Sequence, residues 1–152
     1  MSAADGRAQA RMLVRLRHVR MEAAARALEE ARAAAARAEA ERARADAAAA
    51  AADERHRAAC EDLTLDPGEA ERLLAVADHQ RFRQSVARSA LGDARERERQ
   101  CGEAERERRR LMILARARHD RIAEHADALA RRWARRDEER TAWEIDEARR
   151  PR

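Results

Sequence analysis

The stretch "LTLDPGEAERLL", residues 63–74, is where one helix must end and another can begin. Pro67 lacks a backbone N–H, so a continuous helix through it would lose a hydrogen bond and meet a steric clash. The same stretch spells a helix start, with Asp66 as an acidic N-cap, proline at the first helical position and Glu69 at the third. We therefore expect one reversal of the chain, between residues 63 and 68.

The composition of the 152 residues favours long helices over a layered globular core. Charged residues make up 42% of the chain and aromatic residues 2%, which leaves little bulky apolar surface to bury. Ala, Arg and Glu dominate, and all three are strong helix formers. A disordered chain is the weaker alternative, because apolar residues recur periodically through much of the sequence.

Apolar residues recur at steps of three and four on both sides of the turn, which is typical of helices with one buried stripe. In the first arm, about 5–62, the expected stripe is Met12, Leu16, Val19, Ala23, Ala27, Ala31, Ala34, Ala38, Ala45, Ala49 and Ala52. In the second arm, about 67–149, it is Leu73, Leu74, Ala77, Phe82, Val86, Ala90, Leu111, Leu114, Ala115, Ile122, Ala126, Leu129 and Trp133. The fold class predicted is all-α, with two long helices forming an antiparallel coiled-coil hairpin as a single elongated domain over residues 1–152.

Folding the arms back about residues 63–68 sets a register in which residue 20 faces residue 111. The second arm then outruns the first, so we expect residues 129–149 to project partly alone. Most bulky residues of the first arm lie before residue 29, and alanine fills the stripe from there to residue 62. A partner helix could therefore approach closely along the alanine part.

The charged residues indicate a solvated surface rather than a nucleic-acid site. The segment 95–110 holds 12 charged residues in 16, but acids interleave with arginines and spoil a phosphate-tracking face. Stacking aromatics and groove-reading motifs are missing from the sequence. Residues 45–75 carry 3 arginines against 8 acids, whereas both chain ends are basic. The two ends are therefore expected to select different partners.

Catalytic, metal-binding and cofactor-binding functions are not expected. No two of the five histidines have the i,i+3 or i,i+4 spacing that places ligands on one helical face. The sequence has no glycine-rich phosphate loop and no nucleophile with a base beside it. Cys60 and Cys101 have no C-x-x-C spacing, which favours reduced thiols and a cytoplasmic location. No segment is apolar enough to predict membrane insertion.

Two clusters keep apolar bulk where two helices cannot fully bury it. They either pin the ends of the hairpin or form partner-binding surfaces. At the open end the candidate residues are Met12, Leu16, Val19, Arg20, Leu129, Trp133, Arg136 and Trp143. At the turn-proximal end they are Leu65, Leu73, Leu74, Val76 and Phe82.

The two ends of the chain resemble one known family. The segment "MLVRLRHVRMEAAARALEEAR", residues 12–32, is similar to the opening pattern of the central stalk proteins of bacterial type III secretion, the YscO/FliJ family. The segment "WARRDEERTAWEIDEARR", residues 133–150, resembles the acid-rich ending of that family. The layout matches along the whole chain, although residues 47–52 are poorer in bulky side chains than the family pattern.

The resemblance implies a non-enzymatic cytoplasmic stalk at the inner-membrane export apparatus. Such a stalk inserts into the hexameric secretion ATPase, promotes its activity and couples it to the cytoplasmic ring of the export gate. On this reading the open-end candidates meet the ATPase and the turn-proximal candidates meet the gate. Export chaperones are a third class of partner, and export of the chain itself stays open. The alternatives are a generic coiled-coil scaffold or self-associating rod and, less favoured, a basic nucleic-acid-binding protein.

Overall fold

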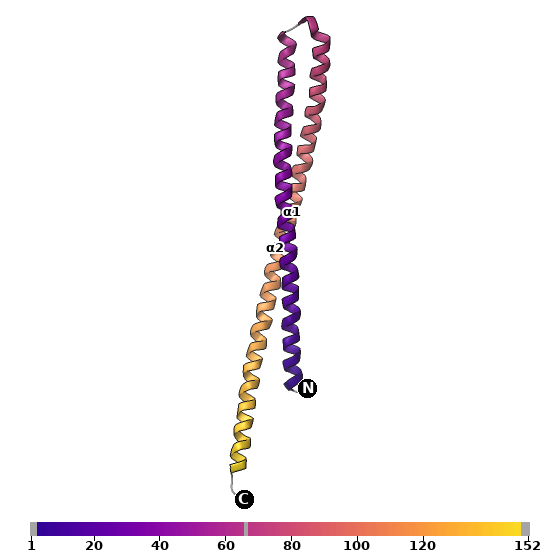
Figure 1. The fold of residues 1–152 in the computed structure, drawn as a ribbon. Helices are drawn as coiled ribbons and strands as arrows, with labels where there is room; N and C mark the ends of the chain where they lie inside the picture. The colour runs from indigo at the N-terminus through magenta and orange to yellow at the C-terminus, as the bar shows by residue number, and fades with distance from the viewer. Residues whose placement is uncertain (1–2, 66, 150–152) are drawn as a thin grey trace. The chain divides into compact units, whose positions relative to one another are not determined.

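The chain folds into two long helices that reverse direction once (Figure 1). The computed structural model describes residues 3–65 and 67–149, and the side chains of residues 5–63 and 68–149. Helix α1 spans Ala3–Leu65, a 3₁₀ turn η1 spans Pro67–Glu69, and helix α2 spans Ala70–Arg149. The two helices pack against each other, which confirms the predicted all-α helical hairpin.

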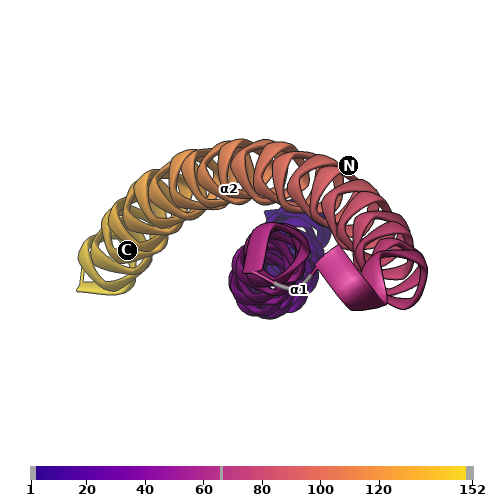
Figure 2. The same ribbon diagram turned by 90° about the horizontal axis from the view of Figure 1, so that it is seen from above.

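The reversal lies slightly further along the chain than the sequence predicted. Helix α1 continues to Leu65 instead of ending near residue 62, and η1 separates it from α2. Pro67 opens η1, where its missing N–H interrupts no helical hydrogen bond. Seen nearly end on, η1 lies between the end of α1 and the start of α2 (Figure 2).

Packing divides the hairpin into two compact units. Unit 1 consists of Met1–Leu28 with Arg108–Arg152, and unit 2 of Glu29–Glu107. Each unit therefore contains one stretch of α1 and one stretch of α2. The expectation of a single elongated domain over residues 1–152 stays a prediction.

Unit 2 is held by a narrow seam built mainly of alanine. The seam is the set of half-buried and buried positions that recur every three or four residues on the facing sides of the helices. In α1 it contains Ala31, Ala35, Ala38, Arg42, Ala45, Ala49, Ala52, His56, Ala59 and Leu63. In α2 it contains Leu73, Ala77, Gln80, Gln84, Ala87, Leu91, Ala94, Glu98, Cys101 and Glu105. Among the side chains that the structure describes in this unit, six alanines and Leu91 are buried, because small side chains let the two backbones approach.

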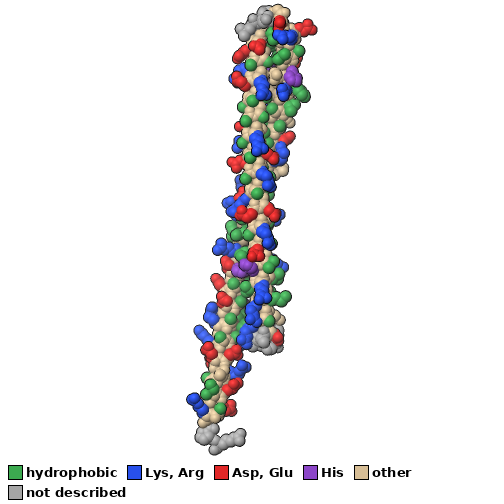
Figure 3. Space-filling model, in the orientation of Figure 1, with side chains coloured by type: hydrophobic (Ala, Val, Ile, Leu, Met, Phe, Trp, Pro, Cys, Tyr) green, Lys and Arg blue, Asp and Glu red, His purple; other side chains and the backbone are tan. Residues whose placement is uncertain are grey.

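Charged residues beside the seam of unit 2 link its two helices. The Arg42 Nε lies 3.2 Å from Glu98 Oε2, and Arg88 Nε lies 3.1 Å from Asp53 Oδ1. Weaker pairs join Arg95 to Asp46, Arg97 to Glu41 and Arg32 to Glu105. Acidic and basic side chains are interspersed over the displayed surface (Figure 3). The charged segment 95–110 is thus partly a cross-helix ion-pair network as well as a solvated face.

Unit 1 has a seam with larger side chains and less complete burial. Its α1 positions are Ala10, Val14, Arg17, Met21, Ala24 and Leu28, and its α2 positions are Met112, Ala115, His119, Ile122, Ala126, Leu129 and Trp133. Leu28 is 5% exposed and is the buried core residue of the described part of this unit. The His18 and His119 rings lie 5.6 Å apart between centroids, so the two helices contact each other at this level.

The pairing register differs from the predicted one by about one heptad. The predicted register placed residue 89 opposite Arg42, whereas the structure pairs Arg42 with Glu98, nine residues further along. It placed residue 99 opposite Arg32, which instead pairs with Glu105, six residues further. Part of the offset follows from the turn, since the longer α1 and the added η1 move the reversal toward the C-terminus.

Part of the predicted buried stripe was wrong. Met12, Leu16 and Val19 are exposed, because the seam of unit 1 uses positions two residues earlier, such as Ala10, Val14 and Arg17. The corresponding error in α2 placed Phe82, Val86 and Ala90 in the seam, and all three are exposed. Met12, Leu16 and Val19 in α1, and Phe82 and Val86 in α2, thus form rows that run two positions away from the true seam.

Candidate partner-binding surfaces

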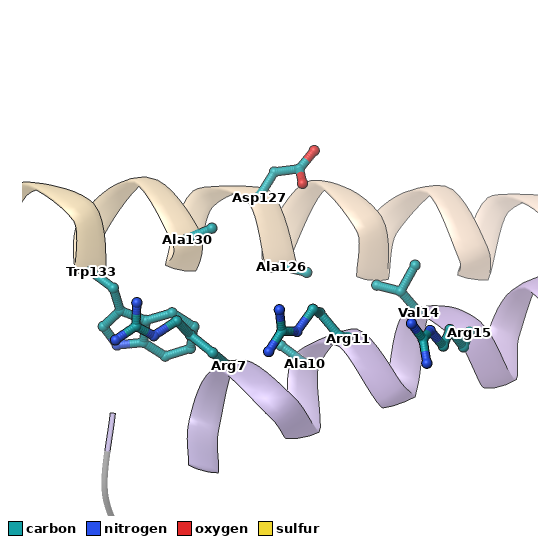
Figure 4. A pocket seen from close by; sticks show the side chains of 9 residues that line it. All are labelled: Arg7, Ala10, Arg11, Val14, Arg15, Ala126, Asp127, Ala130 and Trp133. Carbon is teal, nitrogen blue, oxygen red and sulfur yellow. The ribbon is translucent and has the colours of Figure 1, made fainter. Parts of the chain in front are cut away.

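Trp133 forms the end of the seam in unit 1 by packing against Gly6 of α1. A Cβ atom added at Gly6 would lie 3.2 Å from Trp133 Cζ2 and 3.5 Å from Cη2, so glycine makes room for the indole. Figure 4 shows the indole reaching from α2 to α1 beside the side chain of Arg7. Trp133 is therefore half-buried and has a partner in its own chain. The sequence analysis had placed it both at the end of the expected buried stripe and in the partly projecting segment 129–149, and the structure bears out the first assignment.

Two shallow grooves flank this contact. One has a volume of about 420 Å³ and is lined by Arg7, Ala10, Arg11, Val14, Arg15, Ala126, Asp127, Ala130 and Trp133 (Figure 4). The other, of about 290 Å³, is lined by Gly6, Gln9, Ala10, Leu13, Ile122, His125, Ala126, Leu129 and Trp133. Their floors are apolar, and the first has three arginines from α1 along its edge. Asp127 points away from α1 in this view.

An apolar row on the outside of α1 is a second surface of unit 1. We call it the outer α1 face, consisting of Met12, Leu16 and Val19, with exposed fractions of 74%, 46% and 56%. Spacings of four and three residues place these side chains on one side of the helix. Arg15 and Arg20 are exposed beside this row, each three or four residues from one of its members. The outer α1 face is thus an apolar strip with arginine on both flanks.

The last turns of α2 form a third surface, the α2 tail, residues 138–149. Arg7 Nη2 lies 3.4 Å from Asp137 Oδ2, and this ion pair joins α2 to the second turn of α1. Every residue from 141 to 149 is exposed, and Trp143 keeps 73% of its surface in contact with solvent. Large aromatic side chains left in water are characteristic of binding hot spots. The α2 tail therefore carries a large aromatic anchor, Trp143, with the exposed Ile145 two residues further on.

Unit 2 carries an exposed apolar row on α2. Phe82 is 66% exposed, and Val86 lies one turn further along the same side. They border a shallow hollow lined by His79, Phe82, Arg83, Val86, Ala87 and Ala90. Leu74 and Val76 are exposed nearer the turn, whereas Leu73 is half-buried in the seam. The side chain of Leu65, the remaining turn-proximal candidate, lies outside the described residues.

The structure separates the open-end candidates into three groups. Leu129 and Trp133 are half-buried in the seam of unit 1. The outer α1 face gathers Met12, Leu16 and Val19, with Arg20 at its edge. Arg136 is exposed near the start of the α2 tail, which holds Trp143.

Sequence reasoning found Leu129 and Trp133 among the residues that line the grooves but missed others on α1. Arg7 and Val14 were not among the candidates, although the seam positions of α1 continue back to Ala10 at the same spacing. A search for the unbroken heptad row, rather than for the bulkiest side chains, would have found Val14. Gly6 gave no local signal, since only the contact with Trp133 reveals its role.

Hydrogen bonds shift the pKa of two carboxyl groups in unit 2. Asp53 accepts hydrogen bonds from Arg88 and, at 3.0 Å, from the Gln84 amide, and these hold its pKa below the usual value. The pKa of Glu96 is lowered to about 2 by hydrogen bonds from Arg99 and then Gln100, one turn along α2. Asp53 joins the two helices, whereas the Glu96 contacts are local to α2.

Metal sites, membrane spans and relatives give no further guidance on function. Among the residues the structure describes, no three His, Cys, Asp or Glu side chains are grouped so that they could hold a metal ion. Neither long helix, over its described length, has a stretch apolar enough to cross a membrane. Comparisons with protein-family models, characterised proteins and solved structures gave no significant match to this chain. Function has therefore to be inferred from the surfaces themselves.

Proposed function

We propose that this protein is a non-enzymatic stalk of a type III secretion export apparatus. Unit 1 docks into the hexameric secretion ATPase and promotes ATP hydrolysis, and unit 2 contacts the cytoplasmic ring of the export gate. The chain thereby couples the two machines, and export chaperones are further partners of the same hairpin. The proposal starts from the resemblance of residues 12–32 and 133–150 to the YscO/FliJ family.

The observation that best supports the proposal is the combination of exposed apolar side chains and arginines in unit 1. Met12 and Trp143 are both almost three-quarters exposed, and arginines flank the outer α1 face. Apolar anchors supply affinity when a partner buries them, and surrounding charges steer docking. A partner with acidic loops and apolar pockets is the complement of this surface.

The exposed residues and charges of unit 2 support a partner different from the one that binds unit 1. Its exposed row of Phe82 and Val86 lies on a helix that begins in an acidic stretch of the chain, residues 45–75. The acids of residues 45–75 disfavour a partner that the arginine-flanked surface of unit 1 attracts, whereas the hollow beside Phe82 is itself lined by His79 and Arg83. Separate partners for the two units are what a coupling protein requires.

The test is the hydrolysis rate of a purified hexameric secretion ATPase with and without the chain. Wild-type chain should raise the rate, and Trp143→Ala should lose most of that increase because it removes the exposed anchor of unit 1. Phe82→Ala is the matched control, since it removes an exposed aromatic side chain of unit 2. It should leave stimulation intact and weaken capture of the export-gate ring.

Two results would contradict the stalk proposal. One is a wild-type chain that changes the rate of no secretion ATPase offered to it. The other is equal loss of stimulation in the Trp143 and Phe82 variants, which would mean that the two units are not used differently. In either case a coiled-coil scaffold that binds through its whole surface becomes the better account.

A further inference from the structure

We propose that the α2 tail of one copy docks on the outer α1 face of a second copy, so that two chains associate through reciprocal contacts. This inference does not rest on the proposed function, because both surfaces belong to this chain. It starts from two exposed surfaces in unit 1 whose chemistry is complementary.

The first surface is apolar and positive. Residues 7–21 of α1 contain five arginines and no acid. Arg15 and Arg20 border the outer α1 face on its two sides, so an occupant meets the apolar row of Met12, Leu16 and Val19 between two guanidinium groups. Neither Arg15 nor Arg20 forms an ion pair with another described residue, so both are available to a partner.

The second surface is apolar and negative. The α2 tail contains five acids against two arginines, and its one large aromatic residue is Trp143. Glu139, Asp146 and Glu147 lie four residues before, three after and four after Trp143, so all three are on the side of the helix that carries the indole. None of these acids pairs with another described residue. An indole surrounded by carboxylates matches an apolar strip flanked by arginines, and arginine also binds well over the face of tryptophan.

The two surfaces cannot meet within one chain. The Arg7–Asp137 ion pair and the Trp133–Gly6 contact fix the start of α1 beside residues 133–137 of α2. The α2 tail continues away from that point as an unbroken helix to Arg149. Reaching Met12 would require the helix to bend back on itself. If the α2 tail is to cover the outer α1 face, the tail must therefore come from another copy.

The spacing of the surfaces allows a closed dimer. His18 contacts His119, so the outer α1 face lies level with that part of α2, and Trp143 lies about 24 residues beyond, or roughly 35 Å along the helix. In an antiparallel pair related by a two-fold axis, the tail of each copy can overlie the outer α1 face of the other. Each contact is then made twice, so neither the α2 tail nor the outer α1 face of either copy is left unmatched to extend a fibre.

The test is sedimentation equilibrium of two charge-reversed variants, alone and mixed. The first is Arg15→Glu with Arg20→Glu, and the second is Glu139→Arg with Glu147→Arg. Wild-type chain should form a dimer that dissociates as salt is raised, because the contact is partly ionic. Each variant alone opposes like charges and should dimerise at least about tenfold more weakly. An equimolar mixture should restore the dimer, since both reciprocal contacts then join opposite charges.

Two single substitutions test the apolar anchor. Trp143→Ala should weaken self-association at least about tenfold while leaving the helical circular dichroism unchanged, because this side chain is exposed in the hairpin. Phe82→Ala, the control in unit 2, should leave the dimer intact. A wild-type chain that stays monomeric at low salt would overturn the inference, as would a mixture of the charge-reversed variants that remains monomeric. Neither outcome depends on an ATPase, so it would leave the proposed function standing.

Discussion

Replacing glycines by alanine should have opposite effects in the two units. At Gly92 and Gly102 nothing lies within 4 Å of an added Cβ atom, so alanine should bring only its better helix propensity. At Gly6 the added atom would lie 3.2 Å from Trp133 Cζ2 and would push the indole out of its contact. The sign of the change in the free energy of unfolding therefore shows which glycine faces the seam.

The expected magnitudes follow from these surroundings. Alanine in a helix interior is favoured over glycine by about 1 kcal/mol, and sites ten residues apart with no shared neighbour add independently. Gly92→Ala with Gly102→Ala should thus stabilise the hairpin by about 2 kcal/mol, or raise Tm by roughly 4–8 °C for a chain of this size. Gly6→Ala should give no gain and a loss of up to about 2 kcal/mol, because overpacking displaces the indole.

The assay is thermal unfolding followed by far-ultraviolet circular dichroism for each variant. A second readout is the fluorescence of Trp133 in a Trp143→Phe background, where it is the single tryptophan. Gly6→Ala should shift that emission to longer wavelength, and the unit 2 double variant should leave it unchanged. A stabilised Gly6 variant with unaltered fluorescence would refute the packing of Trp133 against α1.

Three further predictions test the packing and the ion pairs between the two helices. Leu28→Ala should lower the free energy of unfolding, measured by urea titration, by about 2–3 kcal/mol because Leu28 is 5% exposed. Met12 is 74% exposed, so Met12→Ala should change it by less than about 0.5 kcal/mol. Equal effects would contradict the seam of unit 1. The pKa of Asp53 is lowered on folding, so its contribution to the free energy of unfolding is present above the usual value of 3.8 and is lost as pH falls through the folded-state pKa. Asp53→Asn should therefore reduce the loss of stability at acidic pH. An unchanged loss would exclude the cross-helix role of Asp53. A double-mutant cycle on Arg42 and Glu98 should return a coupling of roughly 0.5–1 kcal/mol, and zero coupling would argue against the register.

The reversal could be predicted because one local feature determines it. Pro67 cannot sit inside a helix, and its surroundings fit a helix start, so the turn needed no knowledge of tertiary packing. The helices likewise follow from composition. The alanine seam of unit 2 was also predicted in part, since Ala31, Ala38, Ala45, Ala49 and Ala52 repeat with no bulkier competitor nearby.

The seam of unit 1 could not be predicted because two rows with the same spacing compete there. Met12, Leu16 and Val19 are bulkier than Ala10 and, unlike Arg17, are apolar, so a search for apolar bulk selects the outer row. Periodicity fixes the spacing of a stripe but not which side of the helix meets the partner. The same ambiguity moved Phe82 and Val86 into the expected seam of unit 2. These misplaced residues are now the exposed surfaces proposed to bind partners.

The most direct test of the stalk account is cross-linking from a defined position in each unit to the secretion ATPase. Cys60 is exposed in unit 2 and becomes the only thiol when Cys101 is replaced by serine. In a second chain, Ala142→Cys with Cys60 and Cys101 replaced by serine places the only thiol in the α2 tail. Each chain, labelled with a photoreactive maleimide, is illuminated with the hexameric ATPase. The account predicts an ATPase adduct from position 142 and none from position 60. Adducts from position 60 alone would contradict the account. So would the absence of an adduct from position 142 when the ATPase and the chain are both at concentrations above their measured Kd.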